Sequence, residues 1–249
     1  MAVFAIADLH LSASSDHPMD VFGSRWSNYT EKISKRWKAV VTEKDTVILP
    51  GDFSWGMTLE QAKADFALLE SLPGQKLLSK GNHDFWWETA AKMNRFFEEN
   101  GFHSIRLLYN NAYVVEDFIV CGTRGWFLEE GQQQAVGTVD YEKIVNREVL
   151  RLRLSLEEAK KLAQEQIASK EILAFLHFPP VWNSFECPEI LAVLKEYGVK
   201  RCFHGHIHGN YFAPLHRVVD DLTLTMVSSD FLDFYPLPIH PERNSFLIS

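Results

Sequence analysis

Five short polar blocks, each placed directly after an apolar run, constrain this chain more than any other feature. The blocks are Asp8-Leu9-His10, Gly51-Asp52, Gly81-Asn82-His83-Asp84, His177 in a Leu-His-Phe-Pro setting, and Gly205-His206-Ile207-His208-Gly209. The apolar runs before them are typical of buried strands. Because the strand ends of an open α/β sheet converge on a crevice, the five blocks are expected to meet at one site.

The segments between these blocks alternate between strand and helix patterns. Short apolar stretches predict strands at residues 3–7, 46–49, 76–78, 172–176 and 201–203. Helical periodicity predicts helices at residues 29–41, 59–69 and 88–99, and two more helical segments between residues 141 and 168. Antiparallel strands are expected at residues 211–212, 222–227 and 246–248. The pattern is therefore typical of an α/β protein.

Composition narrows the class of protein. Of the 249 residues, 46% are hydrophobic and 23% are charged, which is ordinary for a soluble globular protein. The formal net charge of −8, without a run of Lys or Arg, disfavours a general grip on nucleic acid. Cys121, Cys187 and Cys202 lack metal-type spacing and are expected to be buried thiols. Because no leader and no apolar segment of roughly 20 residues is found, we expect a cytoplasmic protein without membrane contact.

In this order the blocks match the pattern D-x-H, G-D, G-N-H-[D/E], H and G-H-x-H, and the chain resembles the calcineurin-like metallophosphoesterase superfamily. The resemblance extends from Asp8 to Gly209, which is nearly the whole chain. It implies a four-layer α/β/β/α sandwich of two mixed sheets flanked by helices. We expect a single domain of this kind over residues 1–249.

The resemblance also implies a pair of metal ions that share the carboxylate of Asp52. The ligands of the first metal would be Asp8, His10, Asp52 and His208. The ligands of the second metal would be Asp52, Asn82, His177 and His206. Imidazole and carboxylate ligands suit Mn, Fe and Zn, so we expect two divalent or trivalent ions, with Mn first and Fe or Zn as alternatives.

For the chemistry, the resemblance implies in-line attack on phosphorus by a hydroxide that the two metals activate. His83 is not among the implied ligands and would face the leaving group, as general acid or as charge stabiliser. Asp84 would hydrogen-bond His83 and so fix its tautomer. Asp84 could also cap the helix that follows it.

Aromatic residues crowd the blocks, and core packing is the ordinary explanation for most of them. Trp55, Trp86 and Trp126 are nevertheless candidates to stack on an apolar or heterocyclic leaving group. Arg124 is the candidate phosphate clamp, because guanidinium matches phosphate geometry, although a surface ion pair is an equal alternative. Residues 18–26 are a candidate cover for the site. Histidines outside the blocks are expected to be structural or at the surface: His17, His103, His204, His216 and His240.

Within the superfamily, the classical Ser/Thr protein phosphatases carry G-D-x-x-D-R-G and R-G-N-H-E. Here the second block continues as Phe53-Ser54-Trp55-Gly56, and Lys80 precedes the third block. The compact arrangement is similar to small bacterial phosphodiesterases, so we expect a metal-dependent phosphodiesterase whose partner is a small-molecule phosphoester, with a nucleotide as one candidate. The alternative enzyme is a small-molecule phosphomonoesterase. A non-catalytic scaffold of the same fold is the alternative of another class, but such scaffolds typically lose ligands that this chain keeps. The oligomeric state stays open.

Overall fold

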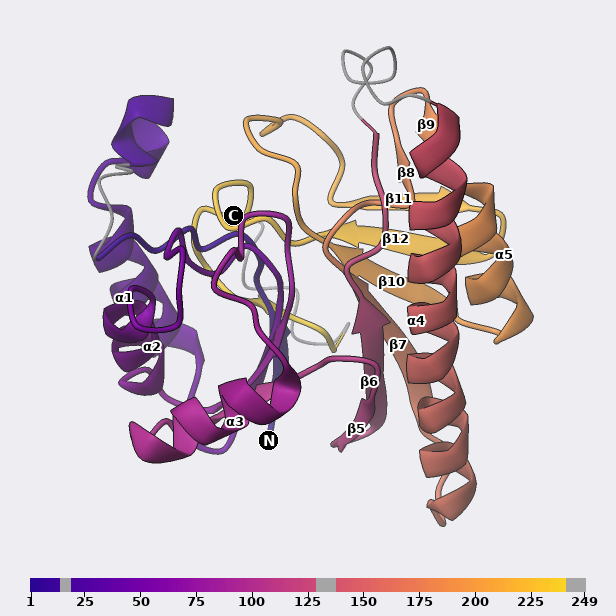
Figure 1. Ribbon diagram of the computed structural model, residues 1–249, viewed down its shortest axis with the longest axis horizontal. Coiled ribbons are helices and arrows are strands. Elements are labelled where there is room, and N and C mark those ends of the chain that lie inside the picture. Colours follow the sequence, from indigo (N-terminus) through magenta and orange to yellow (C-terminus); the bar gives the residue numbers. More distant parts are fainter. Residues whose placement is uncertain (14–18, 129–137, 241–249) are drawn as a thin grey trace.

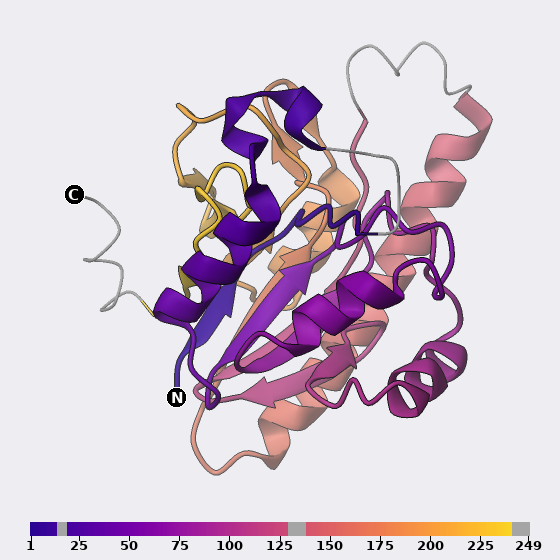
Figure 2. The same cartoon turned by 90° about the vertical axis from the view of Figure 1, so that its left-hand side faces the viewer.

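The computed structural model describes residues 1–13, 19–128 and 138–240. Two β-sheets pack against each other in the middle of the molecule (Figure 1). Three helices from the first half of the chain cover the outer face of one sheet, and two helices from the second half cover the other (Figures 1 and 2). Both large sheets contain parallel and antiparallel pairs. The expected α/β/β/α sandwich of two mixed sheets is therefore confirmed.

The first sheet has the strand order β13-β1-β2-β3-β4. Its strands are β1 (Val3–Ala5), β2 (Thr46–Pro50), β3 (Gln75–Ser79), β4 (Ile105–Leu107) and β13 (Leu237–Pro238). The neighbours are parallel except β13, which pairs antiparallel with β1. Over this sheet lie α1 (Tyr29–Val40), α2 (Lys63–Glu70) and α3 (Ala90–Glu99). Because β1, β2 and β3 are parallel, the first three polar blocks begin at the same edge of the sheet.

The second sheet has the strand order β11-β12-β10-β7-β6-β5. Its strands are β5 (Ala112–Val115), β6 (Phe118–Thr123), β7 (Glu171–Leu176), β10 (Arg201–His204), β11 (His216–Val219) and β12 (Leu222–Met226). Its outer face is covered by α4 (Thr138–Glu165) and α5 (Pro188–Glu196). The remaining elements are the hairpin of β8 (Val181–Trp182) and β9 (Phe185–Glu186), and the 3₁₀ helices η1 (Met19–Phe22) and η2 (Ser24–Trp26).

Apolar side chains fill all three spaces between the layers. On α1, Ile33 and Trp37 lie one turn apart and are fully buried against the first sheet. Between the sheets, the rings of Phe175 on β7 and Phe203 on β10 stack with their centroids 4.8 Å apart. Full burial of one such side chain contributes about 1.5–3 kcal/mol. The strand ends that carry the polar blocks therefore belong to a rigid frame.

The chain differs from the sequence prediction at two places. The two helical segments expected between residues 141 and 168 form the single helix α4, because Thr138–Glu165 contains neither Gly nor Pro. Residues 211–212 form a turn instead of a strand, and the predicted strand at 246–248 lies outside the described residues. The three cysteines are buried free thiols, as expected. No helix in the described ranges is both long and apolar enough to cross a membrane.

Candidate metal centre

The five polar blocks meet at the carboxyl ends of β1, β2, β3, β7 and β10. Parallel pairing puts these ends at one edge of each sheet, and the packing of the sheets brings the two edges together. Four of the seven candidate ligands have no more than 2% of their surface exposed: Asp8, His10, Asp52 and His177. The other three, Asn82, His206 and His208, are partly exposed. The side chains therefore line a site that opens to solvent on one side.

Asp8, His10 and His208 form a first cluster of potential ligand atoms, all within 4.8 Å of one another. The Nε2 atoms of His10 and His208 lie 3.2 Å apart. Asp52, His177 and His206 form a second cluster of the same kind. The amide Oδ1 of Asn82 lies 2.6 Å from Nε2 of His177 and so joins the second cluster. The structure thus brings together all seven side chains that the sequence suggested as ligands.

The carboxylate of Asp52 lies between the two clusters. Its Oδ2 atom is 3.7 Å from Nε2 of His10 in the first cluster and 3.5 Å from Nε2 of His177 in the second. A carboxylate in this position could contact two metal ions at once, which is the role that the family resemblance implies for Asp52. Two metals about 3.5–4 Å apart form a recurrent arrangement in phosphatases and nucleases.

The local chemistry fits bound cations. Asp8 Oδ1 and His10 Nδ1 are buried, and neither has a hydrogen-bond partner among the described residues. Burial raises the pKa of Asp8 well above its usual value and that of Asp52 to about 6. Burial also lowers the pKa of His10 and His177 well below the usual range, which keeps both imidazoles in the neutral form that binds metals. Cations would compensate the buried carboxylates, so this set of donors suits a metal pair.

Two glycines leave room for the carboxylates of the site. A Cβ atom on Gly81 would lie 2.1 Å from Asp52 Oδ1, and one on Gly205 would lie 2.6 Å from Asp8 Oδ2. Neither position could accept a larger residue without moving a candidate ligand. The glycines of the third and fifth blocks therefore belong to the geometry of the site.

A comparison with protein families matches residues 1–210 to the calcineurin-like phosphoesterases. The chain belongs to this family. Membership supports a metal-dependent phosphoesterase activity.

Comparisons with solved structures and with curated sequences say less about function than the family match does. The phosphopantetheinyl hydrolase PptH from Mycobacterium tuberculosis is similar with a TM-score of 0.53 and 13% identity, covering 97% of each chain. The protein TT1561 of Thermus thermophilus is similar with a TM-score of 0.57 and 10% identity, covering 92% of this chain and 90% of the other. At these identities the likeness shows the fold alone. No curated protein sequence matches.

In this calcineurin-like phosphoesterase, hydrogen bonds from outside the five blocks orient two of the histidines. His177 donates from Nδ1 to the carbonyl of Pro50 at 3.1 Å, which leaves Nε2 facing the second cluster. His208 donates from Nδ1 to Asp230 Oδ1 at 2.9 Å, and Asp230 Oδ2 accepts from the Gly209 N–H at 3.0 Å. Although burial alone would lower it, the bond to Asp230 and the nearby carboxylates raise the pKa of His208 to about 9. Asp230 therefore positions a candidate ligand.

Sequence reasoning missed Asp230. It closes the polar block Ser228-Ser229-Asp230, which follows the apolar strand β12. This is the same signal that marked the five blocks, a polar block after a strand, but it matched no motif. The block also reaches the first cluster, because Ser229 donates from its hydroxyl to the carbonyl of Asp8 at 2.7 Å.

Asp84 does not have the partner that the sequence suggested. Its two oxygens accept from the backbone N–H groups of Gly81 (2.7 Å), Asp52 (2.9 Å), Phe53 (2.9 Å) and Ser54 (3.3 Å), and from the Trp86 indole (3.1 Å). The expected hydrogen bond to His83 is therefore wrong, because the chain turns the carboxylate away from that ring. Asp84 instead ties the second block to the third.

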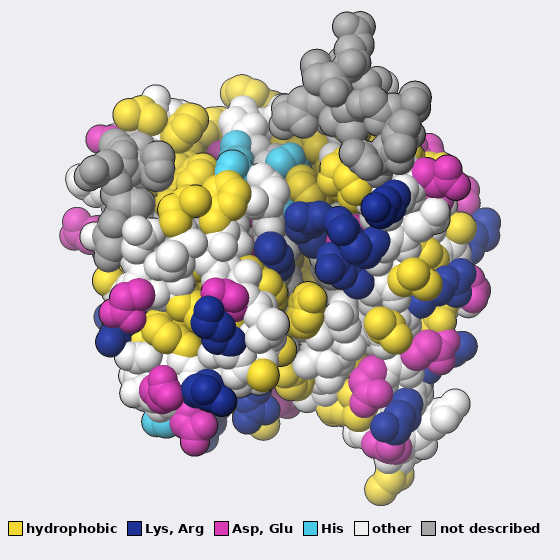
Figure 3. Space-filling model, viewed as in Figure 1, with side chains coloured by type: hydrophobic (Ala, Val, Ile, Leu, Met, Phe, Trp, Pro, Cys, Tyr) yellow, Lys and Arg dark blue, Asp and Glu magenta, His cyan; other side chains and the backbone are white. Residues whose placement is uncertain are grey.

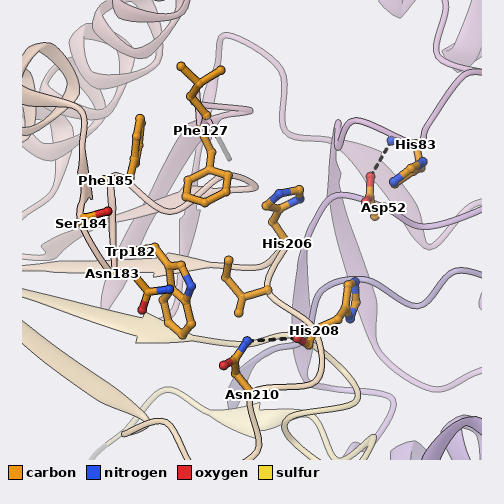
Figure 4. A pocket seen from close by; sticks show the side chains of 12 residues that line it. Asp52, His83, Phe127, Trp182, Asn183, Ser184, Phe185, His206, His208 and Asn210 are labelled. Atoms are coloured by element: carbon orange, nitrogen blue, oxygen red, sulfur yellow. Dashed lines mark hydrogen bonds between the residues drawn. The ribbon is translucent and has the colours of Figure 1, made fainter. Parts of the chain in front are cut away.

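His83 lies at the edge of the centre with its Nδ1 atom unpartnered in the described part of the chain. Its backbone N–H donates to Asp52 Oδ1 at 2.8 Å (Figure 4). The ring centroid of Trp55 lies 4.4 Å from that of His83 and 5.0 Å from that of His10. Trp55 therefore lies at the site, as expected from the sequence.

The other predicted pocket residues have different surroundings. Trp86 is 1% exposed and packs on Phe53 and Phe66 in the core, so the prediction that it stacks on a leaving group is wrong. Trp126 packs on Phe178. Arg124 Nη2 lies 3.7 Å from the carboxylate of Glu148, which is buried, so this ion pair differs from the surface pair that the sequence left as an alternative.

Residues around the first block complete the surroundings of the centre. Trp26 is buried, with its ring centroid 5.7 Å from that of His208, so the end of the predicted cover packs beside the first cluster. His17 and Pro18 lie outside the described residues. Burial lowers the pKa of His204 to about 4, which agrees with a structural residue. His103 and His216 are exposed, and His240 is partly exposed.

A cavity of about 470 Å³ adjoins the metal centre. Five residues of the polar blocks line it: Asp52, His83, His206, Ile207 and His208. The other side is largely aromatic and includes Phe127, Trp182, Asn183 and Phe185, whereas Asn210 lies next to His208 (Figure 4). The cavity therefore extends well beyond the space that the candidate ligands enclose.

Proposed function

We propose that this protein is a metal-dependent phosphodiesterase that acts on a small molecule or a nucleotide. The position of Asp52 Oδ2, within 3.7 Å of a histidine nitrogen in each cluster, carries the proposal. When bound, two metal ions supply a nucleophile at neutral pH and positive charge for the phosphoryl oxygens. Family membership supports hydrolysis of a phosphate ester.

The two clusters correspond to two proposed metal sites, which share Asp52. The first would be held by Asp8, His10, Asp52 and His208. The second would be held by Asp52, Asn82, His177 and His206. Manganese is the metal we propose, with iron or zinc as alternatives, because neutral imidazole and carboxylate ligands suit all three.

The size of the adjoining cavity supports a diester over a monoester. A monoester needs space for one organic group, whereas a diester places a second group beside the phosphorus. The cavity of about 470 Å³ holds apolar and amide side chains on the side away from the ligands, including Phe127, Trp182 and Asn183. Such walls suit an organic ester group, and the indole of Trp55, 4.4 Å from the His83 ring between centroids, gives a further flat surface nearby.

Hydrolysis of bis-p-nitrophenyl phosphate and p-nitrophenyl phosphate with added Mn²⁺ tests the proposal. We expect a higher kcat/KM for the diester, and we expect Asp52→Asn to abolish turnover and lower the bound Mn²⁺. Asp117→Asn makes the same chemical change at an exposed carboxylate and serves as the control. A clear preference of the wild-type protein for the monoester would make it a phosphomonoesterase instead.

His83 is the proposed proton donor or charge stabiliser at the leaving group, because the residue borders the cavity beside Asp52. His83→Ala is expected to keep both metals and to lose about 10²–10⁴-fold in turnover of an alkyl ester. A p-nitrophenyl ester, whose leaving group needs little protonation, should lose much less. Equal losses on both esters at full metal content would remove His83 from this role.

A further inference from the structure

Four basic side chains line a second cavity, of about 210 Å³. They are Lys80, Arg124, Arg147 and Arg151. Figure 3 shows Lys and Arg side chains gathered on one face of the molecule, next to histidine side chains that reach the surface there. A concentration of positive charge is unusual here, because the whole chain carries a formal net charge of −8.

The cavity contains more positive charge than its own residues can neutralise. Glu148 is the one acidic residue among those that line it. Its carboxylate is buried and accepts from Arg151 Nη1 at 2.6 Å and from the Thr123 hydroxyl at 2.9 Å. The side chains of Lys80 and Arg147 make no ion pair or hydrogen bond with any described residue. Arg124 Nε is buried and has no hydrogen-bond acceptor among the residues that the structure describes.

This cavity is separate from the main one but uses the same frame. The two have no lining residue in common among the described residues. Lys80 follows β3 and precedes Asn82 by two residues, so their Cα atoms lie within about 7.6 Å. The backbone carbonyl of Arg124, at the end of β6, accepts from the N–H of His177 at 3.1 Å. Both cavities therefore adjoin strand ends of the same frame, and Lys and Arg side chains lie beside histidine side chains on one face of the molecule (Figure 3).

We propose that Lys80, Arg124, Arg147 and Arg151 form a subsite for a second phosphate group of the substrate. The inference rests on the proposed function and narrows the substrate to phosphoesters that carry another, non-scissile phosphate. Arginine side chains bind phosphate through paired N–H donors, and several cations around one small space match the charge of a phosphate dianion. A nucleic-acid backbone would instead need a basic surface that continues over many phosphates.

Binding of inorganic phosphate in EDTA tests the subsite without any turnover. Without metals, phosphate has no metal ion to bind at the centre, and the part of the affinity measured by calorimetry that depends on Arg147 then reports on the basic cavity. Arg147→Gln is expected to weaken phosphate binding by about tenfold, the value of one charge-assisted hydrogen bond. Arg153→Gln is the matched control, because Arg153 lies on the same helix but pairs with Glu196 outside the cavity.

The second measurement compares two dinucleotides that differ only in a 5′-phosphate, pApA and ApA, with Mn²⁺ present. The ratio of kcat/KM for pApA over ApA should exceed one in the wild-type protein and fall about tenfold in Arg147→Gln. The Arg153→Gln protein should keep the wild-type ratio.

The outcomes separate the two proposals. Phosphate affinities that are equal in the wild-type and Arg147→Gln proteins overturn the subsite. A wild-type ratio of one, with phosphate still bound in the basic cavity, also overturns its role in substrate binding. Phosphate binding that depends on Arg147, in a protein that hydrolyses neither dinucleotide nor bis-p-nitrophenyl phosphate, supports the anion site and refutes the phosphodiesterase.

Discussion

Asp230→Asn should weaken one of the two metal sites and leave the other in place. The substitution keeps the size of the side chain but removes its charge. In the present structure Asp230 accepts from His208 Nδ1 at 2.9 Å and from the Gly209 N–H at 3.0 Å. An asparagine has one carboxamide oxygen and can accept only one of these bonds in the same orientation. Gly209 is exposed, so water can replace its bond, and the main loss is the charge that holds the His208 imidazole.

The size of the effect follows from this geometry. Removing a carboxylate that orients a metal-binding histidine typically costs about 10–100-fold in metal affinity. This range corresponds to about 1.4–2.7 kcal/mol. Because His208 belongs to the first cluster and His177 keeps its bond to Pro50, only the first site should lose affinity.

Titration of the metal-free protein with Mn²⁺, followed by electron paramagnetic resonance of the free ion, measures both sites. The wild-type and Asp117→Asn proteins should bind two ions per chain, whereas Asp230→Asn should bind one ion normally and the second about 10–100-fold more weakly. Two unchanged affinities would refute the reasoning, because His208 would then hold its position without Asp230. Equal weakening of both sites would also refute it, since the effect would not be local to His208.

Three further results are expected. Asp84→Asn turns an NH2 group either toward the N–H groups of Gly81 and Asp52, which share Oδ2, or toward those of Phe53 and Ser54, which share Oδ1. It should cost about 1–3 kcal/mol in urea unfolding with Mn²⁺ bound. Unchanged stability with lost activity would return Asp84 to the role beside His83. Burial lowers the pKa of Lys76 from 10.5 to about 8. Between pH 8 and 10.5 the unfolded chain therefore binds more protons than the folded protein does. The unfolding free energy in EDTA should thus rise with pH by up to about 3 kcal/mol across that window. Lys76→Met should remove this rise, and a wild-type slope in the variant would show that another group causes it. Removing the metals should lower the unfolding free energy by about 2.7 kcal/mol for each of the two proposed sites, relative to a protein with free Mn²⁺ at a hundred times the Kd of that site. An unchanged melting temperature would contradict stabilising binding.

The sequence was sufficient to place the candidate ligands at one site. Each polar block follows a strand, and parallel strands end at the same edge of a sheet, so pattern and geometry agree at Asp8, Asp52 and His177. The order of the five blocks also led to the correct family and to the two-sheet sandwich. The meeting of the blocks follows from local pattern, whereas the sandwich was predicted only through the resemblance, because periodicity alone does not count layers.

Properties that depend on packing could not be predicted in the same way. The basic cavity combines Lys80 after β3, Arg124 after β6, and two arginines one turn apart on α4, so no run of charge indicates it. The direction of the Asp84 carboxylate depends on how the second block lies against the third, which no spacing reports. In the sequence Trp86 stands close to the third polar block, where a pocket residue would be expected. In the structure it is buried among core side chains.

The backbone of the centre also carries strain that no residue pattern reveals. Asp8, His10, Asp52 and His206 have φ between 46° and 71°, in the left-handed region that costs other residues than glycine about 1–2 kcal/mol each. Hydrogen bonds between the first two blocks hold this conformation, since Asp8 N–H donates to the Gly51 carbonyl and His10 N–H to the Asp52 carbonyl, both at 3.0 Å. Asp8 and His10 both direct their side chains into the first cluster. Four of the eleven non-glycine residues with positive φ in the described ranges are thus residues proposed to bind metal, where pre-organised ligands reduce the cost of ordering the site when the ions bind.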